Sequence, residues 1–226
     1  MTGAAAISRA EFDGLPRLPL RRPTNWKPAV WRVETSDGPV VVKDVRHCRG
    51  FFERRFARWL LGRERRVLER LGVLAGTPRL LGSIDADAMV LSFVPGRALD
   101  AELFRRRPRD LLAQLRSLTD QLHARGIYHL DLHQRKNLLV DDDGRLHVID
   151  FGAAVVPGRV AKALLGRLFR AIDHQAGFKF LARFTPDELT VDEARMVLRQ
   201  RSLRRLWPFK TVSQSASLAA RRRLQQ

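Results

Sequence analysis

The sequence has 226 residues and 45% hydrophobic side chains, which exclude an intrinsically disordered chain and allow one large domain or two small ones. Lys and Arg total 42 against 24 Asp and Glu, so the formal net charge is +18. Codon bias toward arginine explains this excess, and so does an anionic partner such as nucleic acid, a membrane surface or a phosphorylated substrate; composition alone does not separate them.

The cellular location is predicted from three absences in the sequence. The single cysteine, Cys48, cannot form an internal disulfide, so neither a disulfide partner nor an oxidising compartment is expected. Residues 1–14 lack the basic start and apolar run of a signal peptide. No segment approaches the ~20 apolar residues of a membrane span. We therefore expect a cytoplasmic protein, with a peripheral position on the inner face of a membrane as the alternative.

The first half of the chain is predicted to be rich in strands. Residues 28–35 and 40–45 have strand composition, and the Ser-Asp-Gly-Pro turn between them predicts a hairpin. Residues 50–71 carry aromatic and leucine side chains at helical spacing, which predicts a helix. Two short apolar strands follow at 79–84 and 88–93, separated by an acidic turn.

The second half is predicted to be mainly helical. Pro95-Gly96 interrupts the chain, and residues 108–125 place a row of leucines on one face of a helix. A hairpin is predicted at 138–149, and arginine-rich helices are predicted from 157 to 226. The predicted fold is α+β, with a strand-rich lobe of residues 1–94 and a mainly helical lobe of residues 95–226.

Between His129 and Gly152, Asp131, Asn137 and Asp150 supply three oxygen-bearing side chains in a fixed order. Phosphoryl transfer needs a carboxylate that orients the attacking hydroxyl or accepts its proton, and it needs a metal ion on the phosphates. Carboxylate and amide oxygens are the ligands that Mg²⁺ prefers. The segment therefore indicates phosphoryl transfer, while a helix, loop and hairpin with incidental polar residues is the structural alternative.

The order of these residues resembles the protein-kinase superfamily. His129-Leu130-Asp131 stands where that family has its His-Arg-Asp catalytic loop, and Asp150-Phe151-Gly152 matches its metal-binding motif. The resemblance implies a small two-lobed kinase fold that uses ATP with Mg²⁺, or with Mn²⁺ in its place. It also implies that Asp131 is the catalytic carboxylate, that Asn137 is a catalytic metal ligand and that Asp150 is the main magnesium ligand.

Residues upstream are similar to the nucleotide-binding residues of the same superfamily. Lys43 ends an apolar strand, as does the family's lysine that contacts the phosphates, and Glu64 on the following helix would be its partner. A solvated helix charge is the alternative for Glu64. The resemblance further implies that backbone groups of Ser92, Phe93 and Val94 contact the adenine edge.

The sequence also departs from the family pattern. It has no glycine-rich loop, and residues 23–31 at that position offer Lys27 as a group near the phosphates. Leu130 replaces the arginine of the catalytic loop, and the spacing from Asp131 to Asn137 is one residue longer than usual. These features are similar to atypical bacterial branches, namely RIO-type kinases and lipopolysaccharide-core kinases of the Kdo or heptose type.

The acceptor is predicted from the basic segment 46–63, which places aromatics and leucines among arginines as an interfacial helix does. A core-facing helix with solvated arginines is the alternative. We expect a kinase for the hydroxyl of a cell-envelope or lipid-linked sugar, such as lipopolysaccharide core, near an anionic membrane surface. The other hypotheses are a RIO-like serine/threonine protein kinase that meets RNA or a ribosome, and a non-catalytic binding module. The basic tail adds Arg199, Arg201, Arg204, Arg205, Trp207, Phe209 and Arg221–Arg223.

Overall fold

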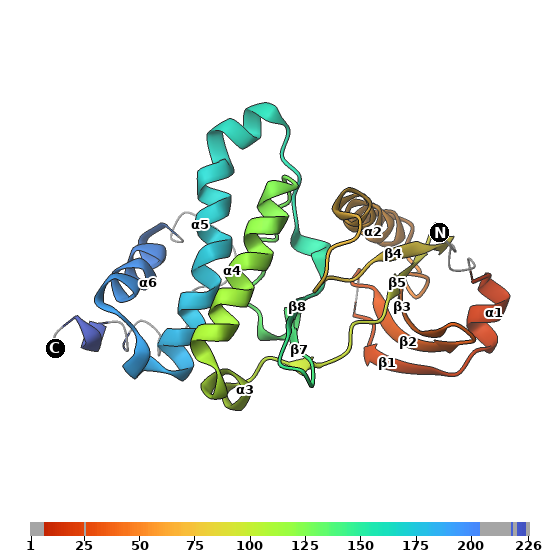
Figure 1. The fold of residues 1–226 in the computed structure, drawn as a ribbon. Helices are drawn as coiled ribbons and strands as arrows, with labels where there is room; N and C mark the ends of the chain where they lie inside the picture. The colour runs from red at the N-terminus through yellow and green to blue at the C-terminus, as the bar shows by residue number, and fades with distance from the viewer. Residues whose placement is uncertain (1–6, 25, 204–217, 219–220, 225–226) are drawn as a thin grey trace. The chain divides into compact units, whose positions relative to one another are not determined.

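The computed structural model describes residues 7–24, 26–203, 218 and 221–224 (Figure 1). The chain divides into two compact units, one of Met1–Val94 with Ile149–Ala153 and one of Pro95–Val148 with Ala154–Gln226. Helices occur together with antiparallel strands, so the predicted α+β class is confirmed. The short segment Ile149–Ala153, which the sequence prediction counted with the second half, packs with the first unit.

The first unit is built on a five-stranded sheet in which every neighbouring pair of strands is antiparallel, in the order β1-β2-β3-β5-β4. The predicted hairpin is confirmed, with pairing that runs from Ala29 opposite Asp44 to Thr35 opposite Gly38. Gly38 has a φ of +106°, a backbone conformation that glycine adopts without steric cost. The strands are β1 Arg17–Arg21, β2 Ala29–Thr35, β3 Gly38–Asp44, β4 Leu80–Asp85 and β5 Ala88–Ser92.

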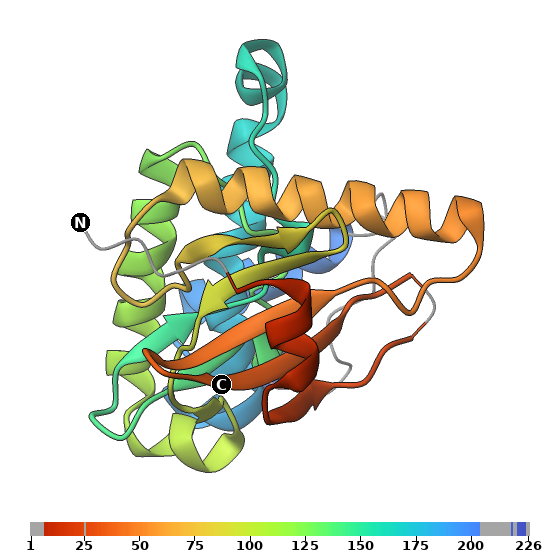
Figure 2. The same ribbon diagram turned by 90° about the vertical axis from the view of Figure 1, so that its right-hand side faces the viewer.

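The two faces of this sheet have different partners (Figure 2). Helix α1, Arg9–Gly14, places Phe12 in an apolar cluster with Val40, Val42 and other strand residues. Because side chains alternate along a strand, Lys43 points to the opposite face. There it meets Glu64 of helix α2, Phe51–Leu71. The sheet thus separates an apolar core from a charged pair.

Two elements at the N-terminus were missed by the sequence prediction. Helix α1 begins at a capping box in which Ser8 and Glu11 bond to each other's backbone N–H groups. The Ser-x-x-Glu spacing is a known start signal and could have predicted this helix. Strand β1 carries no such signal, because it is short, exposed and contains Pro19, which only an edge strand tolerates.

Helix α2 corrects the prediction for the basic segment 46–63. The helix begins at Phe51 and runs without a break to Leu71, so residues 46–50 precede it. Its aromatic residues do not face the core, because Phe52 is 83% exposed and Trp59 is 52% exposed. The face that packs inward is formed by Ala57, Leu61, Glu64, Val67, Leu68 and Leu71.

The arginines of α2 are not simply solvated either. Arg58 Nε lies 2.6 Å from Asp87 Oδ1, and Arg54 bonds to the same carboxylate through two of its nitrogens. The side chain of Asp87 is 6% exposed. Hydrogen bonds from Arg58 and Arg54 hold the pKa of Asp87 well below its usual range. The start of α2 is therefore held to the turn between β4 and β5.

The described part of the second unit contains the helices α3 to α6 and a small three-stranded sheet. The row of leucines predicted on one face of a helix is confirmed, since Leu111, Leu115, Leu118 and Leu122 of α4 are buried. Helix α5 packs against both α4 and α6. The elements are β6 Arg97–Ala98, α3 Ala101–Arg106, α4 Pro108–Ala124, β7 Leu138–Val140, β8 Leu146–Val148, α5 Arg159–Phe184 and α6 Val191–Leu203.

The small sheet requires glycine at the predicted chain break. A Cβ at Gly96 would lie 2.7 Å from the carbonyl oxygen of Val140, and the φ of Gly96 is +123°. The hairpin predicted at 138–149 is confirmed by the pairing of β7 with β8. The hairpin therefore packs directly against the backbone that leads into β6.

The predicted basic tail is described only in part. Arg204, Arg205, Trp207 and Phe209 lie outside the described residues. Arg221–Arg223 form a helical turn. Among the described helices, none has the length and apolar character that crossing a membrane requires.

We predict that Asp87→Asn lowers the free energy of unfolding by about 1–2 kcal/mol, because charge-assisted hydrogen bonds to a buried carboxylate are lost. Urea denaturation monitored by circular dichroism measures this change. Asp143→Asn is the matched control, since Asp143 pairs with Arg145 at an exposed site where both side chains are about 70% exposed. The control should change stability by less than about 0.5 kcal/mol.

The loss of stability in Asp87→Asn should depend on pH. A carboxylate with a lowered folded-state pKa stabilises the protein above its unfolded pKa and loses that contribution as pH falls toward the folded value. The difference between wild type and Asp87→Asn should therefore be constant above about pH 4 and shrink below it. A difference that is the same at every pH would contradict the assignment.

Candidate active site

Lys43, Glu64 and Asp150 form one ion cluster in the first unit. Lys43 Nζ lies 2.6 Å from Glu64 Oε1 and 2.8 Å from Asp150 Oδ1. Lys43 and Glu64 are 5% and 4% exposed. The alternative that Glu64 is a solvated helix charge is therefore wrong. The structure brings together three predicted residues from a strand, a helix and a loop.

The two carboxylates keep Lys43 charged. Burial by itself lowers the pKa of Lys43, but the nearby charges of Asp150 and Glu64 more than offset this, and the net shift is upward. A buried ammonium held by two carboxylates has a defined position, since its rotation would break short charged hydrogen bonds. The cluster therefore offers a fixed cation beside an acidic oxygen donor.

Arg21 is a further member of this cluster that sequence reasoning missed. Its Nη1 lies 3.2 Å from Asp150 Oδ2, so both oxygens of Asp150 accept hydrogen bonds from cations. Arg21 ends β1, a strand that had not been predicted. No local signal distinguishes it from the many other arginines of the chain.

The backbone at Asp150 is held in an unusual conformation. Asp150 has a φ of +63°, which few residues other than glycine adopt. The following 3₁₀ helix, Phe151–Ala153, is anchored by buried Phe151 and by Arg63 of α2, which donates to the carbonyl oxygen of Gly152. Left-handed backbone of this kind is often found at functional sites, because only a tight surrounding structure maintains it.

Asp131 and Asn137 form a second group, which lies in the second unit. Asn137 Nδ2 donates to Asp131 Oδ2 at 3.0 Å and to the Asp131 carbonyl oxygen at 3.1 Å. A 3₁₀ turn, Arg135–Asn137, takes up the extra residue of the long spacing and buries Asn137. Gln134 also donates to Asp131, and His133 Nε2 lies 3.4 Å from Asp131 Oδ1.

Asp173 of α5 holds the backbone on which this second group depends. Its Oδ1 accepts from the N–H of Leu130 at 2.7 Å, and its Oδ2 accepts from the N–H of His129 at 2.8 Å. His123 Nε2 lies 3.0 Å from the same Oδ2. Asp173 is buried, and Leu130 has a φ of +61°. One carboxylate therefore holds the left-handed turn that precedes Asp131.

Sequence reasoning assigned Asp173 no role, although a signal was present. Residues 151–172 contain no Asp or Glu, so Asp173 is the first acidic residue after Asp150. An unpaired buried charge is costly, so a carboxylate that is buried in a helix needs hydrogen-bond donors from other elements. A single acidic residue among many arginines could therefore have been predicted to bind such donors.

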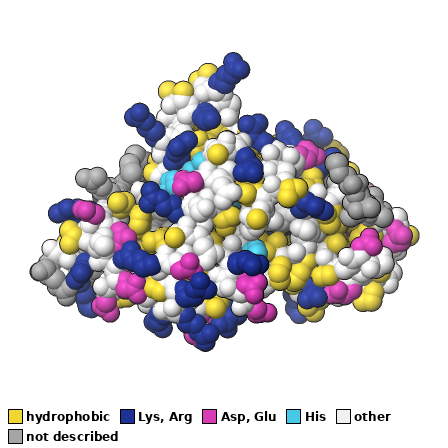
Figure 3. Space-filling view, viewed as in Figure 1, with side chains coloured by type: hydrophobic (Ala, Val, Ile, Leu, Met, Phe, Trp, Pro, Cys, Tyr) yellow, Lys and Arg dark blue, Asp and Glu magenta, His cyan; other side chains and the backbone are white. Residues whose placement is uncertain are grey.

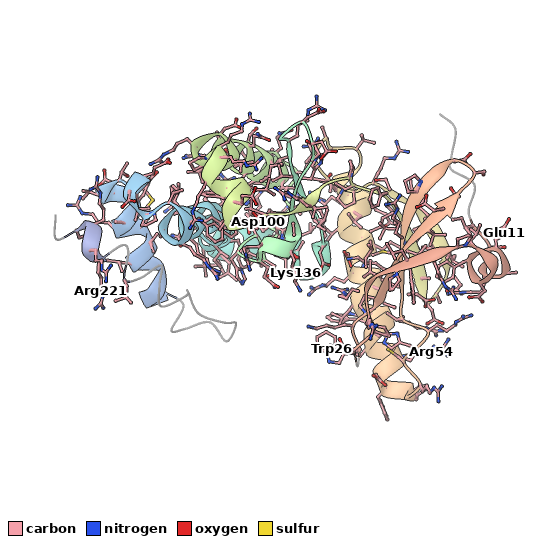
Figure 4. All side chains as sticks on the ribbon, turned by 90° about the horizontal axis from the view of Figure 1, so that it is seen from below. Glu11, Trp26, Arg54, Asp100, Lys136 and Arg221 are labelled. Carbon is pink, nitrogen blue, oxygen red and sulfur yellow. The ribbon has the colours of Figure 1, made fainter. Side chains whose placement is uncertain are left out.

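The remaining predicted nucleotide contacts differ in their surroundings. Lys27 is exposed, and its Nζ lies 5.7 Å from the centroid of the Trp26 ring. Trp26, labelled in Figure 4, packs edge-on against Phe56 of helix α2. The N–H of Ser92 already donates to the Arg79 carbonyl oxygen at 2.8 Å. Its backbone donor is therefore in use within the sheet.

Phe93 and Val94 follow the end of β5 and are half-buried. The guanidinium of Arg32 covers the Phe93 ring at 4.6 Å from its centroid. The Ser92 N–H is in use within the sheet, and the predicted contact of the backbone groups of Ser92, Phe93 and Val94 with a base stays a prediction.

Each unit holds oxygen donors of the kind that magnesium binds. In the second unit Asn137 donates through Nδ2, which leaves its Oδ1 as a potential ligand, and in the first unit Asp150 supplies carboxylate oxygens. Such hard oxygen ligands suit Mg²⁺, which keeps several waters and phosphate oxygens as its other ligands. A separate group of Asp120, His123 and His174 has one donor atom each within 4.8 Å of the others. Its nitrogen donors suit transition metals rather than magnesium.

The chain has relatives among protein kinases over part of its length. No protein-family model matches it. CBL-interacting serine/threonine-protein kinase 21 of Arabidopsis thaliana is 37% identical over 83 residues, which are 34% of this chain and 20% of that relative. CBL-interacting serine/threonine-protein kinase 12 of the same plant is 33% identical over 108 residues, 46% of this chain and 22% of the relative.

A bacterial relative is also found. The probable SapB synthase of Streptomyces coelicolor is 33% identical over 115 residues, which are 42% of this chain and 12% of that protein. The chain thus spans less than a quarter of the length of each of these three relatives. Two of these relatives are serine/threonine-protein kinases by name, and each similarity covers only part of both chains. The kinase activity, its acceptor and the bacterial branch that the sequence analysis favoured stay predictions.

We predict that Asp173→Ala destabilises the protein by about 3–5 kcal/mol, because three buried donors lose one shared acceptor. Hydrogen exchange followed by mass spectrometry should show faster exchange of the amides of His129 and Leu130. Asp192→Ala is the control on α6, since Asp192 is exposed and, among the described residues, pairs only with Arg195. Unchanged protection of the two amides in Asp173→Ala would contradict the role given to Asp173.

Proposed function

We propose that this protein is an ATP- and magnesium-dependent phosphotransferase that transfers the γ-phosphate to a hydroxyl group. The observation that carries the proposal is Lys43 held between Glu64 and Asp150. Phosphoryl transfer depends on positioning and on charge, so it needs a fixed cation for the phosphates and a carboxylate for the metal ion. The partial similarity to protein kinases supports the same activity.

Each group has a proposed role in this reaction. Lys43 binds the phosphates, Glu64 fixes Lys43, and Asp150 and Asn137 ligate magnesium. Asp131 orients the acceptor hydroxyl and accepts its proton as the oxygen attacks the γ-phosphorus and the bond to ADP breaks. In this proposal the first unit supplies the nucleotide-binding residues and the second unit supplies the catalytic loop, as the two lobes of a kinase fold do.

The proposal also assigns the adenine and phosphate contacts of the first unit. Backbone groups of Phe93 and Val94 bind the adenine edge next to Ser92. Lys27, on the turn between β1 and β2, interacts with the phosphates in place of a glycine-rich loop. Mn²⁺ would serve as an alternative metal, because it accepts the same oxygen ligands.

We further propose that the acceptor is a sugar hydroxyl of a cell-envelope or lipid-linked glycan. The chain is strongly basic, and Phe51, Phe52, Phe56 and Trp59 of α2 are exposed. Exposed aromatics next to cations are typical of surfaces that meet phosphorylated lipids. A cytoplasmic enzyme at the inner face of a membrane would meet such an acceptor.

A second candidate acceptor is a serine or threonine hydroxyl of a protein. Two of the similar proteins are serine/threonine-protein kinases by name, which favours it. A basic surface that meets RNA or a ribosome would accompany this candidate. Incubation with radiolabelled ATP and either purified lipopolysaccharide or a ribosome-containing protein extract separates the two by the fraction that becomes labelled.

We predict that Asp150→Ala abolishes phosphoryl transfer and that Asp131→Asn lowers the rate by about 10²–10⁴-fold, because each removes a charge that the transition state needs. Release of ADP in a coupled assay measures turnover, and EDTA should abolish it in the wild type. Asp143→Asn, with an exposed carboxylate outside both groups, should keep the wild-type rate. Binding of ATP without any turnover in the wild type would instead indicate a non-catalytic binding module.

A further inference from the structure

The first half of α5 has an unusual sequence. From Phe151 to Ile172 the chain contains no acidic residue, while it contains Arg159, Lys162, Arg167 and Arg170. Elsewhere in the described chain many cations have acidic partners, as Arg54 and Arg58 have in Asp87. Within the described residues, none of these four cations in the first half of α5 forms an ion pair. Their charge is therefore available to a partner outside the chain.

The same stretch exposes apolar side chains. Val160 is 74% exposed and Leu164 is 76% exposed, and because they are four residues apart they share one side of the helix. Leu165 and Val156 are exposed to a smaller extent, at 42% and 38%. A soluble helix normally turns such residues toward its core, so this apolar side lacks a partner within the described part of the second unit.

The helix is nevertheless firmly anchored. Gly166 lies against the Tyr128 hydroxyl, and Phe169 and Asp173 are buried. In Figures 1 and 2 the N-terminal end of α5 projects past the end of α4. Figure 3 shows hydrophobic and basic side chains together on this projecting end. The helix thus presents an apolar side and cations without ion pairs away from the packed part of its unit.

We propose that this projecting end of α5, residues 156–170, is a docking surface for an anionic lipid bilayer. Val160 and Leu164 enter the boundary between headgroups and acyl chains, and the arginine and lysine side chains extend to the lipid phosphates. The charge complementarity selects this occupant, since a second copy of the chain would bring more cations to the same place. Nucleic acid would use the cations but would leave the exposed valine and leucines in water.

This inference does not depend on phosphoryl transfer. It differs from the expectation for segment 46–63, because Arg54 and Arg58 of α2 share the carboxylate of Asp87, while Arg159, Lys162, Arg167 and Arg170 form no ion pair among the described residues. If both proposals hold, the enzyme works at a membrane surface, and an acceptor embedded there is within its reach. Vesicle binding is measured without ATP, so failure of either proposal leaves the other intact.

The insertion test uses an environment-sensitive fluorophore on Leu164→Cys. The only native cysteine, Cys48, is buried and its thiol pKa is raised by burial, so the new thiol is the one that reacts. Val73→Cys is the matched control, because Val73 is 73% exposed on the loop after α2. Vesicles of phosphatidylcholine with phosphatidylglycerol are compared with vesicles of phosphatidylcholine alone.

The label at position 164 should shift its emission to the blue with the anionic vesicles, and the label at position 73 should not. Added salt should weaken the shift, because the attraction between cations and headgroups is screened. An equal response of both labels, or no response of the label at 164 to anionic vesicles, would overturn the proposal.

Sedimentation with the same vesicles separates insertion from mere charge attraction. Leu164→Asp and Val73→Asp change the net charge equally, but only the first removes an inserting side chain. Leu164→Asp should weaken binding roughly tenfold, while Val73→Asp should bind almost as the wild type does. Equal losses would show that charge alone drives binding. A dimer of the wild type that Leu164→Asp dissociates without vesicles would assign the surface to a second copy and sink the lipid proposal.

Discussion

The buried contact of Lys43 with Glu64 and Asp150 is the constraint on which the first unit depends. An ammonium removed from water is stable only if opposite charges replace its hydration. The strand β3, the helix α2 and the loop after β8 must each supply one member at a fixed distance. Arg21 completes the cluster by occupying the second oxygen of Asp150. Loss of Lys43 would leave the buried carboxylate of Glu64 without the cation that compensates its charge.

The second unit uses a carboxylate for a different purpose. Asp173 satisfies the backbone N–H groups of His129 and Leu130, which point inward because Leu130 has left-handed backbone. Without that acceptor the turn before Asp131 would carry buried unpaired donors, which are costly. A buried polar group needs a partner in both units. This requirement fixes the side chain of Lys43 in the first unit and the backbone turn at Leu130 in the second.

The arginine excess divides into two populations with different consequences. Some arginines have acidic partners and hold elements together, as Arg54 and Arg58 do at Asp87. Others, on the projecting end of α5, have no such partner among the described residues and accompany exposed Val160 and Leu164. Composition counts both populations alike, so the net charge of +18 did not indicate where an anionic partner would bind.

The sequence by itself determined the features that depend on neighbouring residues. These are the hairpin from Ala29 to Asp44, the leucine face of α4, and the order of Asp131, Asn137 and Asp150. Only the tertiary structure decided which charges are buried and paired, because Lys43 and Asp150 are 107 positions apart and Leu130 and Asp173 are 43 apart. Periodicity and turn composition describe local conformation, whereas a contact between distant segments follows from how their elements pack. The packing of distant elements is why Glu64 is a buried partner of Lys43 and why Arg21 and Asp173 contact residues of the candidate site. It is also why the aromatic side chains of α2 face outward.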